Sequence, residues 1–290
     1  MAISAATVKE LRDRTGQAMM DCKKALQETD GDMERAVELL RKKGMAVLEK
    51  RTGRATKEGR VVSKISDDGQ KAVLVSLCCE TDFTAKSEQF GETAATIADL
   101  LLNAENAPDN AEALAAMPCD NGRTVNDLIN DLLSTTGEKT SIGEFARYDL
   151  TGPGVLFCYV HFNNKVGTLI QIDAASAAAA EHQGVQAVAS DLAMHVTASK
   201  PVAVSPDELD PELVAREKEV AAAQIQNKPE HIVEKIVTGK INKWFAEVAL
   251  LEQPFVKDDS KQVKELLAEV GKEAGGDVSV NRFCRVQLGE

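Results

Sequence analysis

The sequence predicts an α+β protein with a small N-terminal three-helix domain, two related α+β subdomains with antiparallel sheets, and an inserted antiparallel helical coiled-coil hairpin. Three observations predict this class. Apolar residues repeat at helical spacing near the N-terminus, a strand–turn–strand pattern followed by a helix occurs twice, and a proline-bounded helical pair interrupts the second copy. The chain has 290 residues, enough for two modest domains, and its hydrophobic content of 43% with only 4% aromatics predicts an aliphatic core.

Three short helices are predicted in the first 45 residues. Thr7 starts a capping-box pattern, and Thr15-Gly16 closes the first helix. The second helix begins near residue 18, and the third follows an N-cap at Asp32 and ends at Gly44. The apolar faces of these two helices are formed by Met19, Cys22, Leu26, Met33, Ala36, Val37 and Leu40. A module of this size typically docks a partner.

The charge of the chain is unevenly distributed. Residues 1–60 carry fourteen Lys and Arg against ten Asp and Glu, a net charge of +4, and include a basic, glycine-containing stretch at 50–57 that is predicted to be a linker. Since the whole chain carries −12, residues 61–290 carry −16. This acidity argues against nucleic-acid binding, which depends on neutralising phosphates. RNA contact by the basic part remains the alternative to an interface with an acidic protein surface, which we favour.

The first α+β subdomain begins with a predicted β-hairpin. Strands over 61–65 and 72–75 flank a turn at Asp67–Gly69. A loop follows, and then a helix with Ile97, Leu100 and Leu101 on its apolar face.

The second subdomain repeats this pattern. Strands over 155–160 and 166–170 flank a turn at Asn163–Lys165. The apolar face of the helix that follows holds Val188, Leu192 and Val196. Similar helical segments at Ala98–Leu100 and Ser190–Leu192 lie 92 residues apart, which indicates an internal repeat.

An insertion over residues 205–247 interrupts the second copy. Pro206 and Pro211 precede a charged helix, and Lys228-Pro229 separates it from a second helix, a pattern typical of an antiparallel helical hairpin. The narrow apolar stripe predicts that the hairpin projects from the body while its helices bury mainly each other. The residues predicted to do so are Leu213, Val220, Ile232 and Ile236. A helix and a strand over 278–288 close the chain.

Sequence motifs of enzymes are absent: there is no phosphate-binding glycine loop, GxGxxG, HExxH or GxSxG. The six cysteines include no CxxC pair or Cys/His knuckle, so no zinc site is predicted. No cofactor is predicted either. Cys78 and Cys79 point to opposite faces of a strand and are predicted to be buried structural thiols, with a redox or catalytic role as the alternative. His195, between apolar neighbours, is predicted to be a core histidine rather than a base.

The segment that follows the second strand of the first hairpin differs from an ordinary loop. Thr81 and Asp82 are natural N-cap residues before a helix. Phe83 is a large aromatic residue in a chain that has few. Two alternatives are open: Phe83 folds back into the core, or it is an exposed wedge for a partner, since aromatic anchors dominate interface energetics.

Four blocks in this order resemble the elongation factor Ts family of bacteria. They are Thr15–Leu26 (TGQAMMDCKKAL), Thr81–Phe83 (TDF), Met194–Pro201 (MHVTASKP) and Gln253–Val256 (QPFV). Together they span nearly the entire chain, which makes the resemblance specific.

The resemblance implies a domain division. Residues 1–50 form a partner-docking three-helix (UBA-like) domain, followed by a linker over 51–59. Residues 60–150 form the first core subdomain. Residues 151–204 and 248–290 form the second, with the coiled-coil insertion over 205–247.

The activity implied by the resemblance is guanine-nucleotide exchange on elongation factor Tu, the GTPase that delivers aminoacyl-tRNA. The chain would bind the GDP-bound and nucleotide-free partner, with no catalytic residue of its own and no nucleic acid or membrane contact. The resemblance assigns displacement of the partner's Mg²⁺ to Thr81, Asp82, Phe83 and Thr84. It assigns docking to Arg12, Met19, Met20 and His161. A homodimer and a heterotetramer with the partner are the oligomeric alternatives.

Two departures from the family pattern stand out. Relatives commonly have Val where this chain has Thr84, whose hydroxyl needs a hydrogen-bond partner and makes the local fit looser. Some relatives continue past the last strand into a helical module that we expect to be missing here. A helical-domain adaptor or chaperone is the alternative function, and a thiol enzyme using Cys78 or Cys79 is a third. The N-terminus lacks a signal-peptide pattern and no apolar run has membrane-spanning length, so a cytoplasmic location is expected.

Overall fold

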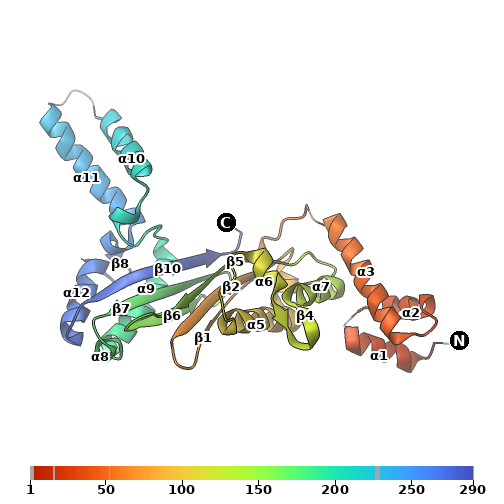
Figure 1. Cartoon of the computed structure of the whole chain (residues 1–290). Coiled ribbons are helices and arrows are strands. Elements are labelled where there is room, and N and C mark those ends of the chain that lie inside the picture. The colour runs from red at the N-terminus through yellow and green to blue at the C-terminus, as the bar shows by residue number, and fades with distance from the viewer. Residues whose placement is uncertain (1–2, 16, 52, 226–228, 290) are drawn as a thin grey trace.

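The computed structural model describes residues 3–15, 17–51, 53–225 and 229–289. A group of three helices, which we call the head, lies at one end of the molecule (Figure 1). Two packed sheets with their covering helices form the body, and a helical hairpin extends from the opposite end of the body (Figure 1).

The head consists of α1 (Ala5–Thr15), α2 (Met19–Glu28) and α3 (Met33–Arg51). The head has a hydrophobic core separate from those of the body. This core is formed by Val8, Leu11, Cys22, Ala25, Leu26, Ala36 and Leu40. The predicted capping box at Thr7 is wrong: the backbone N–H of Thr7 donates to the hydroxyl of Ser4 at 3.1 Å, so the helix begins earlier. The Asp32 carboxylate accepts from the backbone N–H of Arg35 at 3.1 Å, which confirms the predicted N-cap of α3.

The prediction that the third helix ends at Gly44 is also wrong. Helix α3 continues to Arg51 and β1 begins at Glu58, so the predicted linkers over 50–57 and 51–59 both overlap regular elements at their ends. A glycine inside a helix costs only about 1 kcal/mol, which the good helix formers around it can offset. The segment α3 packs against α7 (Val125–Thr136) of the body. Gly16, and Thr52 in the predicted linker, lie outside the described residues.

Two three-stranded antiparallel sheets form the body. The first has the order β1 (Glu58–Ile65), β2 (Lys71–Cys79), β5 (Ser141–Asp149). The second has the order β10 (Val278–Gln287), β7 (Val166–Ala174), β6 (Gly154–Val160). In each sheet the second strand of the hairpin is central and a later strand pairs with its free edge. The two hairpins confirm the predicted repeat, whereas the pairing of the third strands was not part of it.

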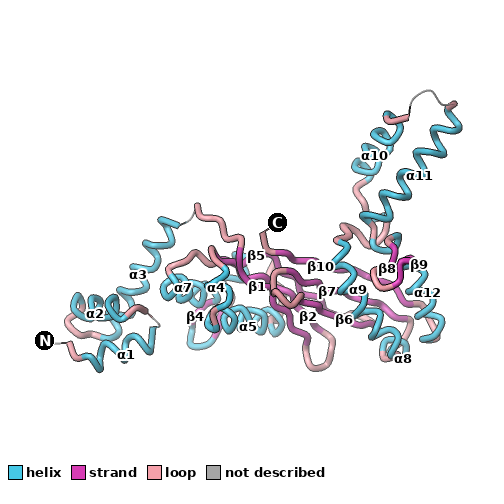
Figure 2. Tube along the Cα trace, turned by 180° about the vertical axis from the view of Figure 1, so that it is seen from behind, coloured by secondary structure: helices cyan, strands magenta, loops and turns pink. Residues whose placement is uncertain are grey.

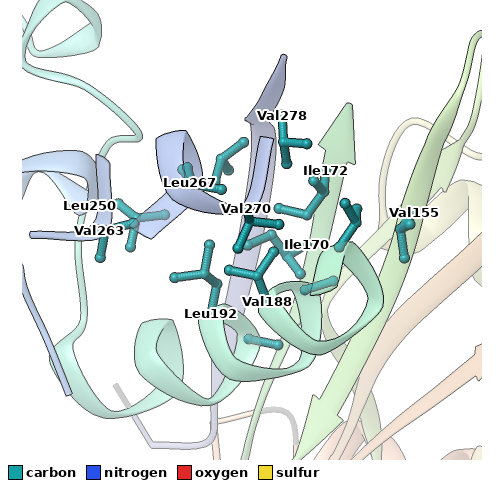
Figure 3. Packing of buried hydrophobic residues seen from close by; sticks show 14 of the residues in the cluster. Val155, Ile170, Ile172, Val188, Leu192, Leu250, Val263, Leu267, Val270 and Val278 are labelled. Atoms are coloured by element: carbon teal, nitrogen blue, oxygen red, sulfur yellow. The ribbon is translucent and has the colours of Figure 1, made fainter. Parts of the chain in front are cut away.

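The sheets pack face to face, and helices cover their outer faces. Alternate residues of β2 therefore enter different cores: Val73, Val75 and Leu77 contact the helix layer, whereas Ala72 and Leu74 join a cluster with residues of the other sheet. Helix α5 (Glu88–Asn103) covers the first sheet, and α9 (Gln183–Ser199) and α12 (Val263–Ala274) cover the second. Figure 3 shows this second core, with Ile170 and Ile172 of β7 against Val188 and Leu192 of α9.

The shorter elements connect these layers. They are α4 (Asp82–Lys86), α6 (Ala111–Ala116), β3 (Pro118–Cys119), the 3₁₀ turn η1 (Asp120–Gly122), β4 (Arg123–Thr124), α8 (Ala177–Ala180), η2 (Pro206–Glu208), η3 (Leu250–Glu252), β8 (Pro254–Phe255) and β9 (Asp258–Gln262).

The hairpin consists of α10 (Pro211–Ala223) and α11 (Glu230–Val248), with Pro229 at the N-cap position of α11 and Lys228 outside the described residues. The prediction that these two helices bury each other through Leu213, Val220, Ile232 and Ile236 is wrong. Leu213, Val220 and Ile232 are 38%, 50% and 36% exposed, and Ile236 is half-buried, while Ala221 and Ile241 are buried. Successive helix positions point about 100° apart, so Val220 and Ala221 cannot both face the partner helix.

Candidate protein-interaction site

The segment after β2 is a rigid corner rather than a loose loop. Strand β2 ends at Cys79, and Thr81 is the N-cap of α4, its hydroxyl accepting from the backbone N–H of Thr84 at 3.4 Å. The backbone N–H and hydroxyl of Thr81 donate to the carboxylate of Glu138 at 3.0 and 2.7 Å. Glu80 accepts from the backbone N–H of Lys139 at 2.8 Å. These bonds fasten the start of α4 to the loop between α7 and β5.

Asp82 is charged and partly exposed at this corner. The Lys86 ammonium donates to its carboxylate at 2.6 Å, one helical turn later. This hydrogen bond lowers the pKa of Asp82 below its usual value, and the positive charge of Lys165 lowers it further. The same contact raises the pKa of Lys86. Since both side chains are exposed, the pair adds little to stability, but the carboxylate remains ionised at neutral pH.

Phe83 projects into solvent with 85% of its surface exposed. Seven residues later, Phe90 is fully buried between α5 and the first sheet. Of the two alternatives for Phe83, folding back into the core is therefore wrong. Thr84 is 7% exposed, so it points inward while its neighbour points outward.

A second group of side chains lies at the turn between β6 and β7. The Tyr159 hydroxyl and Nδ1 of His161 are 3.0 Å apart, within hydrogen-bond distance. The ring of Phe162 lies 4.4 Å from the ring of half-buried His161, centroid to centroid, and Phe162 is 87% exposed. Phe162 is absent from the residues predicted from the sequence. The signal that could have found it is the one used for Phe83: an aromatic residue in a polar turn of an aromatic-poor chain.

Backbone and charge contacts place the two groups on one edge of the body. The backbone N–H of Val61 in β1 donates to the carbonyl of Asn164 at 2.7 Å. The Lys165 ammonium lies 2.7 Å from the carboxylate of Glu58, which pairs in register with Cys79 at the end of β2. The structure thus brings His161 to the same edge as the segment 81–84.

The predicted docking residues of the head form a separate surface. Arg12 is exposed, and Met19 and Met20 are 47% and 60% exposed. The expectation that Met19 shares the buried face of α2 with Cys22 and Leu26 is wrong, because Met19 is the first residue of α2, one turn before the buried part of that face. Helices α1 and α2 lie apart from α4 (Figure 2).

Comparison with known proteins gives one consistent result. A family model described as "Elongation factor TS" matches residues 80–290. The chain is 42% identical to the elongation factor Ts of Nitratidesulfovibrio vulgaris strain DP4, over 100% of this chain and 97% of that protein. It is 42% identical to that of Prosthecochloris aestuarii, over 99% of both chains, and 41% identical to that of Desulfovibrio desulfuricans, over 99% and 98%.

The chain belongs to the elongation factor Ts family. Family membership assigns it to the elongation stage of protein biosynthesis. The family model begins just before Thr81, whereas the alignments with whole relatives also include the head.

The two thiols at the end of β2, just before the segment 81–84, are poor nucleophiles. Burial raises the pKa of Cys79 to about 12 and also raises that of Cys78, and a thiol with a raised pKa holds little reactive thiolate.

Among the residues that the structure describes, no three or more His, Cys, Asp or Glu side chains group to hold a metal ion. Within the same residues, no helix is both long and apolar enough to cross a membrane.

Proposed function

We propose that this protein is a guanine-nucleotide exchange factor for elongation factor Tu, and that it acts without forming or breaking a covalent bond. The observation that carries the proposal is the 85% exposed Phe83 beside the ionised Asp82, both on a corner fastened by Thr81 and Glu138. Nothing in the fold requires a large aromatic side chain in solvent there. A rigid aromatic anchor next to a fixed charge is suited to enter a partner protein.

The mechanism follows from what such a corner does to a GTPase. Mg²⁺ bridges the nucleotide phosphates to the protein, so disturbing its surroundings weakens nucleotide binding. In the proposed complex Phe83 enters between side chains of the GTPase, and the segment 81–84 displaces the ion. Because the coupling is reciprocal, GDP and the exchange factor weaken each other's binding by the same ratio. GTP then fills the vacated site and releases the factor.

Docking is divided between two surfaces in this proposal. The head, residues 1–50, supplies Arg12, Met19 and Met20, and the body supplies His161 at the edge that also presents Phe83. The protein acts in the cytoplasm, where translation takes place, and uses no cofactor.

Release of fluorescent GDP from elongation factor Tu tests the proposal directly. Catalytic amounts of this protein should accelerate release, and the protein alone should not hydrolyse GTP. Unchanged release at several micromolar protein would contradict the proposal and favour the adaptor alternative.

Phe83→Ala separates the wedge from the rest of the interface. An exposed side chain contributes little to the free protein, so its stability should change by less than about 0.5 kcal/mol. The variant should still dock, yet release GDP several-fold more slowly at saturation. Phe90→Ala is the matched control, because removing that buried ring should cost about 3–5 kcal/mol. A large fall in melting temperature with a normal release rate for Phe83→Ala would leave the mechanism without its wedge.

A further inference from the structure

Phe162 is the most exposed large hydrophobic side chain among the described residues, at 87%. Its position is not that of a loose loop. The backbone N–H of His161 donates to the carbonyl of Val166 at 2.9 Å, and that of Asn164 donates to the carbonyl of His161 at 2.8 Å. Asn164 has a φ of +56°, in the left-handed region that Asn tolerates, which closes the turn tightly. Phe162 is therefore held at the corner of an ordered hairpin.

A row of rings supports Phe162 from one side. Its ring lies 4.4 Å from that of His161, and the His161 ring lies 6.1 Å from that of Tyr159. The hydrogen bond between Tyr159 and His161 at 3.0 Å fixes the middle ring. A side chain that is already oriented loses less conformational entropy when it is covered, so this row prepares Phe162 for contact.

The edge that carries Phe162 is the edge that carries Phe83. The turn is joined to β1 by the Val61–Asn164 hydrogen bond and by the Lys165–Glu58 ion pair. Lys165 lies close enough to Asp82 for its charge to act on that carboxylate. A surface that covers Phe83 and Asp82 therefore reaches the turn without leaving this edge.

We propose that Phe162 is a second aromatic anchor, which docks on the same GTPase that Phe83 enters. This inference rests on the proposed function. Continuity with the Phe83 surface identifies the occupant: a single partner contacting both corners would cover the two most exposed rings of the body at once. Buried aromatic residues dominate interface affinity. Phe162 is on the other sheet from the segment 81–84, so it contributes to holding the complex together, and Phe83 contributes to the release step.

Phe162→Ser tests this assignment. The measurements are the affinity of the full-length variant for nucleotide-free elongation factor Tu, by isothermal titration, and the rate of GDP release at saturating variant. We expect affinity to fall by about 10- to 30-fold, the range of an interface anchor, with the saturating rate unchanged. Phe162→Tyr should retain most of the affinity. The matched control is Val202→Ser, which removes another exposed apolar side chain, 68% exposed, and should bind like the wild type.

The outcomes distinguish failure of the second anchor from failure of the proposed function. If wild-type protein accelerates GDP release and Phe162→Ser binds with unchanged affinity, the second anchor is wrong and the proposed function stands. If the wild type neither binds nor accelerates release, the proposed function fails as a whole. Sedimentation of free wild type and variant tests the other occupant: a dimer that Phe162→Ser converts to monomer would assign the ring to a second copy of this chain and overturn the proposal. An unchanged melting temperature excludes a folding defect as the cause of lost affinity.

Discussion

The head and the hairpin are both helical and lie at opposite ends of the molecule, but they bury apolar surface very differently (Figure 1). In the head, Leu11, Cys22 and Leu26 are fully buried in a core that the three helices share. Among the described residues of α10 and α11, only Ala221 and Ile241 are buried. Burial of apolar surface is the main stabilising contribution to a fold. The head therefore has the core of a folding unit, whereas the hairpin depends on its attachment to the body.

The sharpest test of this difference compares two leucines. Leu26→Ala should lower the stability of the head by about 2.7–5 kcal/mol, because it leaves a cavity in a closed core. Leu213→Ala in the hairpin should cost less than about 1 kcal/mol, because the side chain is already 38% exposed. Hydrogen exchange of the amides of α2 and α10 in the full chain measures both effects. Equal losses in the two variants would mean that the hairpin has a core of its own.

Removing the head tests whether it is also the main docking element. Deletion of residues 1–50 should weaken binding to elongation factor Tu by at least about 100-fold, since Arg12, Met19 and Met20 are lost together. The body should keep a cooperative melting transition, because its clusters contain no head residues. Wild-type affinity in the truncated protein would rule out the docking role. Loss of cooperative melting would show that the contact of α3 with α7 is needed for the body to fold.

Removing the hairpin should have a smaller effect. Residues 211–246 lie within the predicted insertion 205–247, and we expect a short loop in their place to leave a cooperatively melting protein that retains at least part of its exchange activity. Leu209 is kept, because it is 6% exposed and belongs to the body side of the insertion. Differential scanning calorimetry and GDP release provide the two measurements. Global unfolding of the variant would show that the hairpin is part of the core, contrary to the comparison.

Much of the body could be predicted from local signals. The turns at Asp67–Gly69 and Asn163–Lys165 contain residues that adopt positive φ, +68° at Gly69 and +56° at Asn164, and both hairpins form as expected. Strand β5 escaped prediction because its residues are nearly all half-buried, which leaves no clear alternation in the sequence.

The candidate site was only partly predictable. The residue types at 81–84 indicated an N-cap and an aromatic next to it, and both lie where expected. Whether Phe83 points toward the core or into solvent depends on the orientation of α4. A hydrogen bond between Thr81 and Glu138, which are 57 residues apart in the sequence, fixes that orientation. No local pattern encodes that contact. Grouping Phe83 with Phe162 requires the packing of the two sheets, which sequence periodicity does not specify.

The base of the hairpin, rather than its helices, provides its attachment to the body. His195 of α9 is fully buried, as predicted for a core histidine, and its Nε2 lies 2.8 Å from the side-chain oxygen of Gln253. The amide nitrogen of Gln253 donates to the carbonyl of Glu247 in α11 at 2.8 Å. The backbone N–H of Val256 donates to Nδ1 of His195 at 3.1 Å. Nδ1 must therefore be unprotonated to accept this hydrogen bond. The neutral ring with its proton on Nε2 can then also donate to the side-chain oxygen of Gln253.

This network predicts a loss of stability in mild acid, the smallest of the expected effects. Burial lowers the pKa of His195 below its ordinary value of 6.5. Between the ordinary and the lowered pKa the unfolded chain binds a proton that the folded chain does not, so stability falls as pH decreases below about 6.5. The slope from this one group is at most about 1.4 kcal/mol per pH unit. Urea unfolding at pH 7.5, 6.5 and 5.5 measures it, and His195→Gln, which cannot titrate, is the control that subtracts the other histidines. A wild-type profile parallel to that of His195→Gln would show that protonation of His195 does not loosen the hairpin base.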